Sequence, residues 1–173
     1  MSASEKITVP SSETQNIMDC LRRIVRTLRL AGRTAEKTLG LSGAQVYVLQ
    51  KLGEGGTLSL NELAERTLTH QSTVSAVASR LVEKGLVVRA ASRDDARRIE
   101  LSLSSTGKEF MGRVPQAPQE NLVRAFEKLP QDQRIKLAEI LSVVIVQAGL
   151  SDQPASMLFD DDESTNPGIR RPR

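Results

Sequence analysis

Residues 69–103 read THQSTVSAVASRLVEKGLVVRAASRDDARRIELSL, and within them the apolar residues change from a helical to an alternating pattern. In the first half, apolar side chains recur at steps of three and four, which predicts a helix ending at Lys84-Gly85. The second half predicts two short strands, over 86–90 and 99–103, joined by a charged loop. A helix followed at once by a two-stranded hairpin is therefore expected.

Two shorter helices precede this unit, and each has a marked start. Ser42 is followed three residues later by Gln45, and Ser59 by Glu62, so both pairs match a capping box. The apolar periodicity that follows predicts helices over 42–52 and 60–66. Together with the helix before the hairpin, these elements predict a winged helix-turn-helix.

Longer helices flank the unit on both sides. Residues 16–39 carry one long apolar stripe that ends at Gly40, a typical helix C-cap residue. This stripe exceeds what a small core needs, so a partner helix from another subunit is expected. After the hairpin, Ser104 or Ser105 begins a helix that Pro115 and Pro118 must kink or split. Pro130 begins the last helix, with its own aliphatic stripe over 137–145.

Composition excludes several classes of protein. The 173 residues are 39% hydrophobic and 26% charged, which is typical of a soluble globular domain. Because Cys20 is the only cysteine and His70 the only histidine, neither a disulfide framework nor a Cys-rich or multi-His metal site is expected. No stretch resembles a membrane span or a signal peptide. The expectation is a cytoplasmic protein without cofactor or metal that is not an enzyme and does not bind membranes.

Positive charge is concentrated around the hairpin. Residues 66–98 contain seven basic and three acidic side chains, whereas the net charge of the whole chain is +3. This local surplus indicates a polyanionic partner, and the helix-turn-helix pattern favours double-stranded DNA.

The expected DNA-binding residues lie on the helix before the hairpin and in the hairpin loop. The helix offers hydrogen-bonding groups near its start, where backbone amides also favour phosphate. The loop offers arginines suited to a narrow minor groove, with Asp95 expected to orient and Arg97 to insert. The predicted set is His70, Gln71, Ser72, Thr73, Ser75, Ser79, Arg80, Arg93, Asp95, Arg97 and Arg98.

The order of these motifs resembles the MarR family of bacterial transcription regulators over residues 17–148. The resemblance rests on Ser72-Thr73-Val74-Ser75, Arg80-Leu81-Val82-Glu83-Lys84-Gly85-Leu86-Val87, Asp95-Ala96-Arg97-Arg98 and Gly107. The chain departs from the family pattern at Ser104, where threonine is usual, and at Ala76, where a basic residue is frequent.

The resemblance implies a mainly α fold with a small β-hairpin wing, built as a six-helix homodimer on a pseudo-palindromic operator. It also implies a repressor that a small phenolic or anionic effector releases from DNA. The corresponding organisation is a flexible arm over 1–15, one domain over 16–150 and a disordered tail over 151–173. Within the domain, 42–103 is the DNA-binding lobe, and 16–39 and 105–150 are the dimerisation helices.

Other residues have alternative interpretations. Tyr47, Arg22 and Arg26 are candidate effector ligands, although a half-buried ring with its hydroxyl in water and a solvated helix face are the ordinary interpretations. Cys20 is either a redox sensor or, as small thiols usually are, a buried or interface residue. The alternative functions are a winged-helix protein-interaction module without DNA binding and a redox-sensing regulator.

Overall fold

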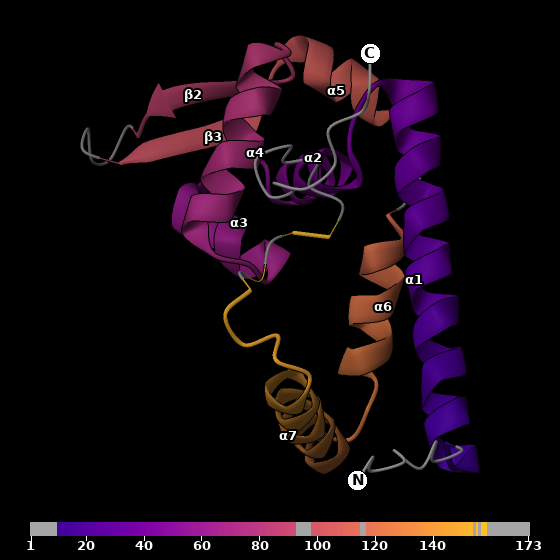
Figure 1. Ribbon diagram of the computed structural model, residues 1–173. Coiled ribbons are helices and arrows are strands. Elements are labelled where there is room, and N and C mark those ends of the chain that lie inside the picture. The colour runs from indigo at the N-terminus through magenta and orange to yellow at the C-terminus, as the bar shows by residue number, and fades with distance from the viewer. Residues whose placement is uncertain (1–9, 93–97, 115–116, 154, 156, 159–173) are drawn as a thin grey trace, which may run out of the picture.

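Seven helices and a small antiparallel sheet make up the computed structural model, which describes residues 10–92, 98–114, 117–153, 155, 157 and 158 (Figure 1). The mainly α fold with a β wing is therefore confirmed. The elements are α1 (Ser12–Leu39), α2 (Gly43–Gly55), β1 (Leu58–Ser59), α3 (Leu60–Thr67), α4 (Gln71–Glu83), β2 (Val87–Ala91), β3 (Ile99–Leu103), α5 (Ser105–Met111), α6 (Pro118–Glu127) and α7 (Gln131–Gln147).

Side-chain caps fix the starts of α2 and α3. In α2 the Gln45 amide donates to Ser42 Oγ at 3.3 Å, and the Ser42 amide donates to Gln45 Oε1 at 3.1 Å. In α3 the Ser59 amide donates to Glu62 Oε2 at 2.8 Å, and the hydrogen bonds from Ser59 lower the pKa of Glu62. Both predicted capping boxes are confirmed. Each one supplies hydrogen-bond partners for amides that a helix start leaves unpaired.

Helix α1 begins four residues earlier than its apolar stripe predicts. Ser11 caps it by accepting from the Thr14 amide at 3.3 Å, so polar residues 12–15 are helical and do not belong to an arm. At the other end Gly40 has a φ of 65°, as expected for a left-handed C-cap.

The helix after the hairpin is split. Helix α5 ends at Met111, and α6 begins with Pro118 in its first turn, where a missing N–H costs nothing. Over the part of the chain that the structure describes there are therefore seven helices, where the family resemblance implies six. Pro130 is the N-cap residue of α7, and the first helical residue is Gln131.

The sheet has a third strand that the sequence pattern does not predict. Its order is β1-β3-β2, with Leu58 opposite Leu101 and Val87 opposite Leu103. Two-residue β1 joins the wing to the start of α3, so the wing is anchored to the helix-turn-helix at its base.

The buried core lies in the helix-turn-helix lobe, between α2, α3, α4 and the sheet. Its largest fully buried side chains include Tyr47, Leu49, Leu63, Leu81 and Leu101. The end of the chain also reaches this core. Met157 is only 5% exposed, so the expectation of a disordered tail is wrong at that residue.

Helix α7 contributes nothing to this core. It lies at the far end of the molecule from the wing (Figure 1), and none of its residues is buried. The stripe of α1 before Leu28 is exposed as well. The exposed large apolar side chains on these two helices are Ile17, Met18, Leu21, Val25, Leu30, Ile135, Ile140, Leu141, Val143, Val144, Ile145 and Val146.

Candidate nucleic-acid interface and apolar pocket

The start of α4 presents polar groups to solvent. His70 caps the helix in an extended conformation, but its side chain makes no capping hydrogen bond. The hydroxyl of Thr69 suits an N-cap and predicts one there, but the structure places the N-cap one residue later, and the buried Thr69 Oγ1 has no hydrogen-bond partner among the described residues. Gln71 and Ser72 are exposed, whereas Thr73 and Ser75 are half-buried. The first amides of α4 are therefore open to an anion.

Farther along α4, Ser79 connects the helix to the wing. Its hydroxyl donates to the Ser75 carbonyl at 2.8 Å and accepts from Arg89 Nη2 at 3.2 Å. Arg89 is exposed on β2 and was not among the predicted contacts, because the pair joins two elements ten residues apart. Arg80 is half-buried on the same helix.

Only part of the predicted wing can be placed. Arg93, Asp95 and Arg97 lie outside the described residues. Arg98 is exposed and lines one hollow with Gln71, together with Asn61 from the start of α3. The loop end of β3 and the start of α4 are thus adjacent, as a combined groove contact requires.

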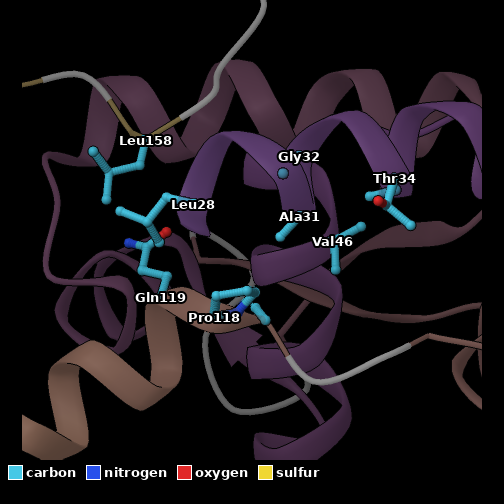
Figure 2. A pocket seen from close by; sticks show the side chains of 11 residues that line it. Leu28, Ala31, Gly32, Thr34, Val46, Pro118, Gln119 and Leu158 are labelled. Atoms are coloured by element: carbon cyan, nitrogen blue, oxygen red, sulfur yellow. The ribbon is translucent and has the colours of Figure 1, made fainter. Parts of the chain in front are cut away.

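A second candidate site is an apolar pocket of about 250 Å³ between the lobe and the long helices (Figure 2). Leu28 and Ala31 of α1, Val46 of α2 and Pro118 of α6 form its walls. Leu158, from the end of the chain, also lines it. The consecutive helices α1 and α2 therefore meet α6, which is distant in sequence, and no single stretch indicates this.

None of the three expected effector ligands lines this pocket. Tyr47 is 1% exposed, so neither the predicted half-buried ring nor a water-exposed hydroxyl is correct. Arg22 is exposed and pairs with Asp19 at 2.6 Å. Arg26 is exposed and lies about 200° around α1 from Leu28, because successive residues turn by about 100°.

Tyr47 belongs instead to a polar contact between α2 and α6, here called the α2–α6 contact. Lys51 Nζ pairs with Glu120 and with Glu54, the latter at 3.1 Å, and lies 5.4 Å from the Tyr47 ring centroid. Beside it, the Ala117 amide at the start of α6 donates to Gln50 Oε1 at 3.1 Å. These bonds join the lobe to the helices beyond the hairpin.

The charges in the α2–α6 contact stabilise one another. Burial lowers the pKa of Lys51, but the hydrogen bonds to Glu120 and Glu54 outweigh burial and raise it overall. The hydrogen bond from Lys51 lowers the pKa of Glu120. Burial raises the pKa of the Tyr47 hydroxyl, which has no hydrogen-bond partner in the structure. Both members of the ion pair are thus held in their charged forms at neutral pH.

The remaining candidates are the single cysteine, a metal site and a membrane span. Cys20 is exposed on α1, which corrects the expectation of burial within the chain and leaves its redox role a prediction. Among the residues that the structure describes, no group of His, Cys, Asp and Glu is arranged to hold a metal ion. None of the described helices is both long and apolar enough to span a membrane.

Comparison with known proteins agrees with this arrangement. The family model described as the MarR family matches residues 39–98, from the end of α1 into the wing. The chain is 30% identical over 118 residues to MdtR, an HTH-type transcriptional repressor of Bacillus subtilis, covering 68% of this chain and 76% of MdtR. The chain belongs to the MarR family. Its role is accordingly that of a MarR-family transcriptional regulator.

Solved structures place the MarR fold over most of the chain. A probable transcriptional regulator from Pseudomonas aeruginosa is 28% identical, with a TM-score of 0.51, over 75% of this chain and 96% of the other. BpsR of Bordetella bronchiseptica, 21% identical, has a TM-score of 0.54 over 79% of this chain and 97% of its own. The DNA binding of BpsR is regulated by 6-hydroxynicotinic acid. These likenesses support the MarR-type winged helix.

Proposed function

We propose that this regulator binds a pseudo-palindromic double-stranded operator as a homodimer and represses transcription until a small molecule releases it. The observation that carries the proposal is the adjacency of Gln71, at the uncapped start of α4, to Arg98, where the hairpin loop meets β3. A helix that enters the major groove and a wing that reaches the adjacent minor groove need this proximity.

Individual side chains then take distinct roles. Gln71 and Ser72 face base edges, and Gln71 has the donor and acceptor that adenine requires. Ser79 holds Arg89 toward the phosphate backbone, since its hydroxyl is already bonded to both Ser75 and Arg89. Asp95 orients the wing arginines, and Arg97 inserts into the minor groove.

Replacing Arg97 with alanine is expected to weaken binding to all DNA sequences about tenfold and to reduce the salt slope, because one phosphate or groove contact is lost. Gln71→Ala is the matched control: it should change the ranking of operator variants while leaving the slope unchanged. Gel retardation across a salt series, with the DNA upstream of the chain's own gene, measures both. An unchanged salt slope for Arg97→Ala would show that the wing does not contact DNA through Arg97. An unchanged ranking of operator variants for Gln71→Ala would show that α4 does not read bases through Gln71.

The uncovered stripes of α1 and α7 support the homodimer. A 17-residue helix with Ile140, Leu141 and Val144 exposed gains little stability alone, and such a surface on a regulator is typical of a subunit interface. A second copy supplies the same stripes by two-fold symmetry, which also matches a palindromic site.

Replacing Val144 with aspartate is therefore expected to raise the dimer dissociation constant at least about tenfold, because the interface would bury an unpaired carboxylate. Sedimentation equilibrium measures this constant. Ser142→Asp is the control on the same helix, since Ser142 is a polar residue that bonds only to the Ala138 carbonyl within α7. A wild-type protein that sediments as a monomer would contradict the dimer.

The apolar pocket supplies the effector part of the proposal. It lies where the lobe meets α1 and α6, so a molecule bound there changes the placement of α4 relative to the dimer helices. MdtR is a repressor, and BpsR is regulated by a small ring compound. MdtR supports the repressor part of the proposal, and BpsR supports control of DNA binding by a small molecule.

A further inference from the structure

The described segment after α7 returns to the lobe. Met157 packs into the hydrophobic core with 5% exposure, and the next residue, Leu158, is 41% exposed and lines the apolar pocket. In Figure 2, Leu158 lies next to Leu28 and near Gln119 at one side of the pocket. A buried residue therefore anchors a half-exposed one at this edge of the site.

The lining of the pocket is mostly apolar. Most of the side chains are aliphatic, and none of the described lining residues is charged. Only Thr34 and Gln119 bring polar side chains, and the Thr34 hydroxyl already donates to the Leu30 carbonyl at 2.9 Å. A carboxylate or phenolate entering this space would lose water without gaining a cation, which is strongly unfavourable.

We propose that Leu158, anchored by Met157, is a lid that the chain itself places over this pocket, and that the site beneath it takes a small, uncharged, apolar molecule. This inference deepens the proposed function, since it assigns the class of effector and a means of controlling its exchange. The family resemblance implies a phenolic or anionic effector, and this inference excludes the anionic one.

The size of the pocket restricts the ligand further. An apolar protein cavity of about 150 Å³ holds benzene. A pocket of about 250 Å³ therefore suits a one- or two-ring aromatic or a comparable aliphatic molecule. With Leu158 at its edge, the pocket removes part of the surface of such a ligand from water.

The test compares two molecules of equal shape and different charge, 2-naphthamide and 2-naphthoate, by calorimetric titration of the full chain without DNA. The wild type is expected to bind the neutral amide at least about tenfold more tightly than the carboxylate. Leu158→Ala is expected to raise the Kd for naphthamide about tenfold and to speed its dissociation, because one apolar wall is lost. Leu150→Ala is the matched control, since Leu150 is 39% exposed in the same terminal segment and does not line this pocket.

A third variant tests the charge argument directly. Leu158→Lys places a cation at the edge of the pocket and is expected to improve naphthoate binding about fivefold relative to the wild type. The ligand class is overturned if the wild type binds naphthoate as well as naphthamide, or binds neither. The lid is overturned if Leu158→Ala and Leu150→Ala bind naphthamide equally.

Operator binding is measured separately, with and without naphthamide. If the binding pattern holds but naphthamide leaves the operator complex intact, the lid and ligand class are supported and the effector role is refuted. If DNA is never bound, the calorimetric result is unaffected and the proposed function fails alone.

Discussion

Gly107→Ala is expected to lower the free energy of unfolding by about 4 kcal/mol, a large part of the roughly 5–15 kcal/mol that stabilises a typical domain. A Cβ atom at this position would lie well inside 3.0 Å of the Leu86 carbonyl oxygen, closer than real Cβ atoms come. The obstacle is backbone, and the same oxygen accepts the Ser104 amide at 3.0 Å, so it cannot move aside cheaply. The start of α5 and the end of the α4–β2 turn would have to separate.

Thermal and urea unfolding followed by circular dichroism measure this loss. Gly112→Ala is the matched control at the other end of α5. Its added Cβ would meet nothing nearer than the Glu109 carbonyl oxygen at 3.5 Å, and the backbone there is helical, with φ of −61°. Equal stability of the two variants would contradict the close approach of α5 to Leu86.

Lys51→Met is expected to cost about 3 kcal/mol at neutral pH, because it leaves the Glu120 carboxylate buried without its main partner. The side chains of Lys51 and Glu120 are only 10% and 13% exposed, so water compensates little. Arg124, with Nε 3.4 Å from Glu120, supplies a weaker residual contact. Methionine keeps the packing of the lysine stem, so the loss reports the charge.

The pH dependence of unfolding identifies the same pair. The pKa of Glu120 is lowered, so its contribution is complete above the ordinary value of 4.5 and is lost as the pH falls below it. The pKa of Lys51 is raised, so its contribution is complete below 10.5 and is lost at higher pH. Urea titrations from neutral pH to below 4.5 should therefore show a shallower acid loss for Lys51→Met than for wild type. Lys128→Met, at an exposed lysine, should retain the full acid loss.

Local signals in the sequence predicted most of the helix-turn-helix. The Ser42–Gln45 and Ser59–Glu62 capping boxes and the apolar steps of α4 depend on neighbours within one turn, so they are readable without tertiary structure. Strand β1 was missed because two residues carry no period, and its pairing with β3 links positions about forty residues apart.

The residues of the candidate sites also fall into two groups, those that local sequence predicts and those that only tertiary packing places. Gln71 and Arg98 were predicted from residue type on an exposed helix start and a loop, and the structure brings them together. The Ser79–Arg89 bond and the burial of Tyr47 depend on how α4 meets β2 and how α2 meets α6. Met157 begins the run Met157-Leu158-Phe159 in a polar tail, and three apolar residues are too few to give a periodic signal, so only packing reveals its place.

The burial of Tyr47 has a practical consequence. It is the only tyrosine in a chain without tryptophan, and its ring lies against Lys51 in the contact between α2 and α6. Near-ultraviolet absorption and emission of the unlabelled protein therefore come chiefly from one interior ring. The fluorescence of Tyr47 in the unlabelled protein therefore reports how closely the helix-turn-helix lobe packs against α6.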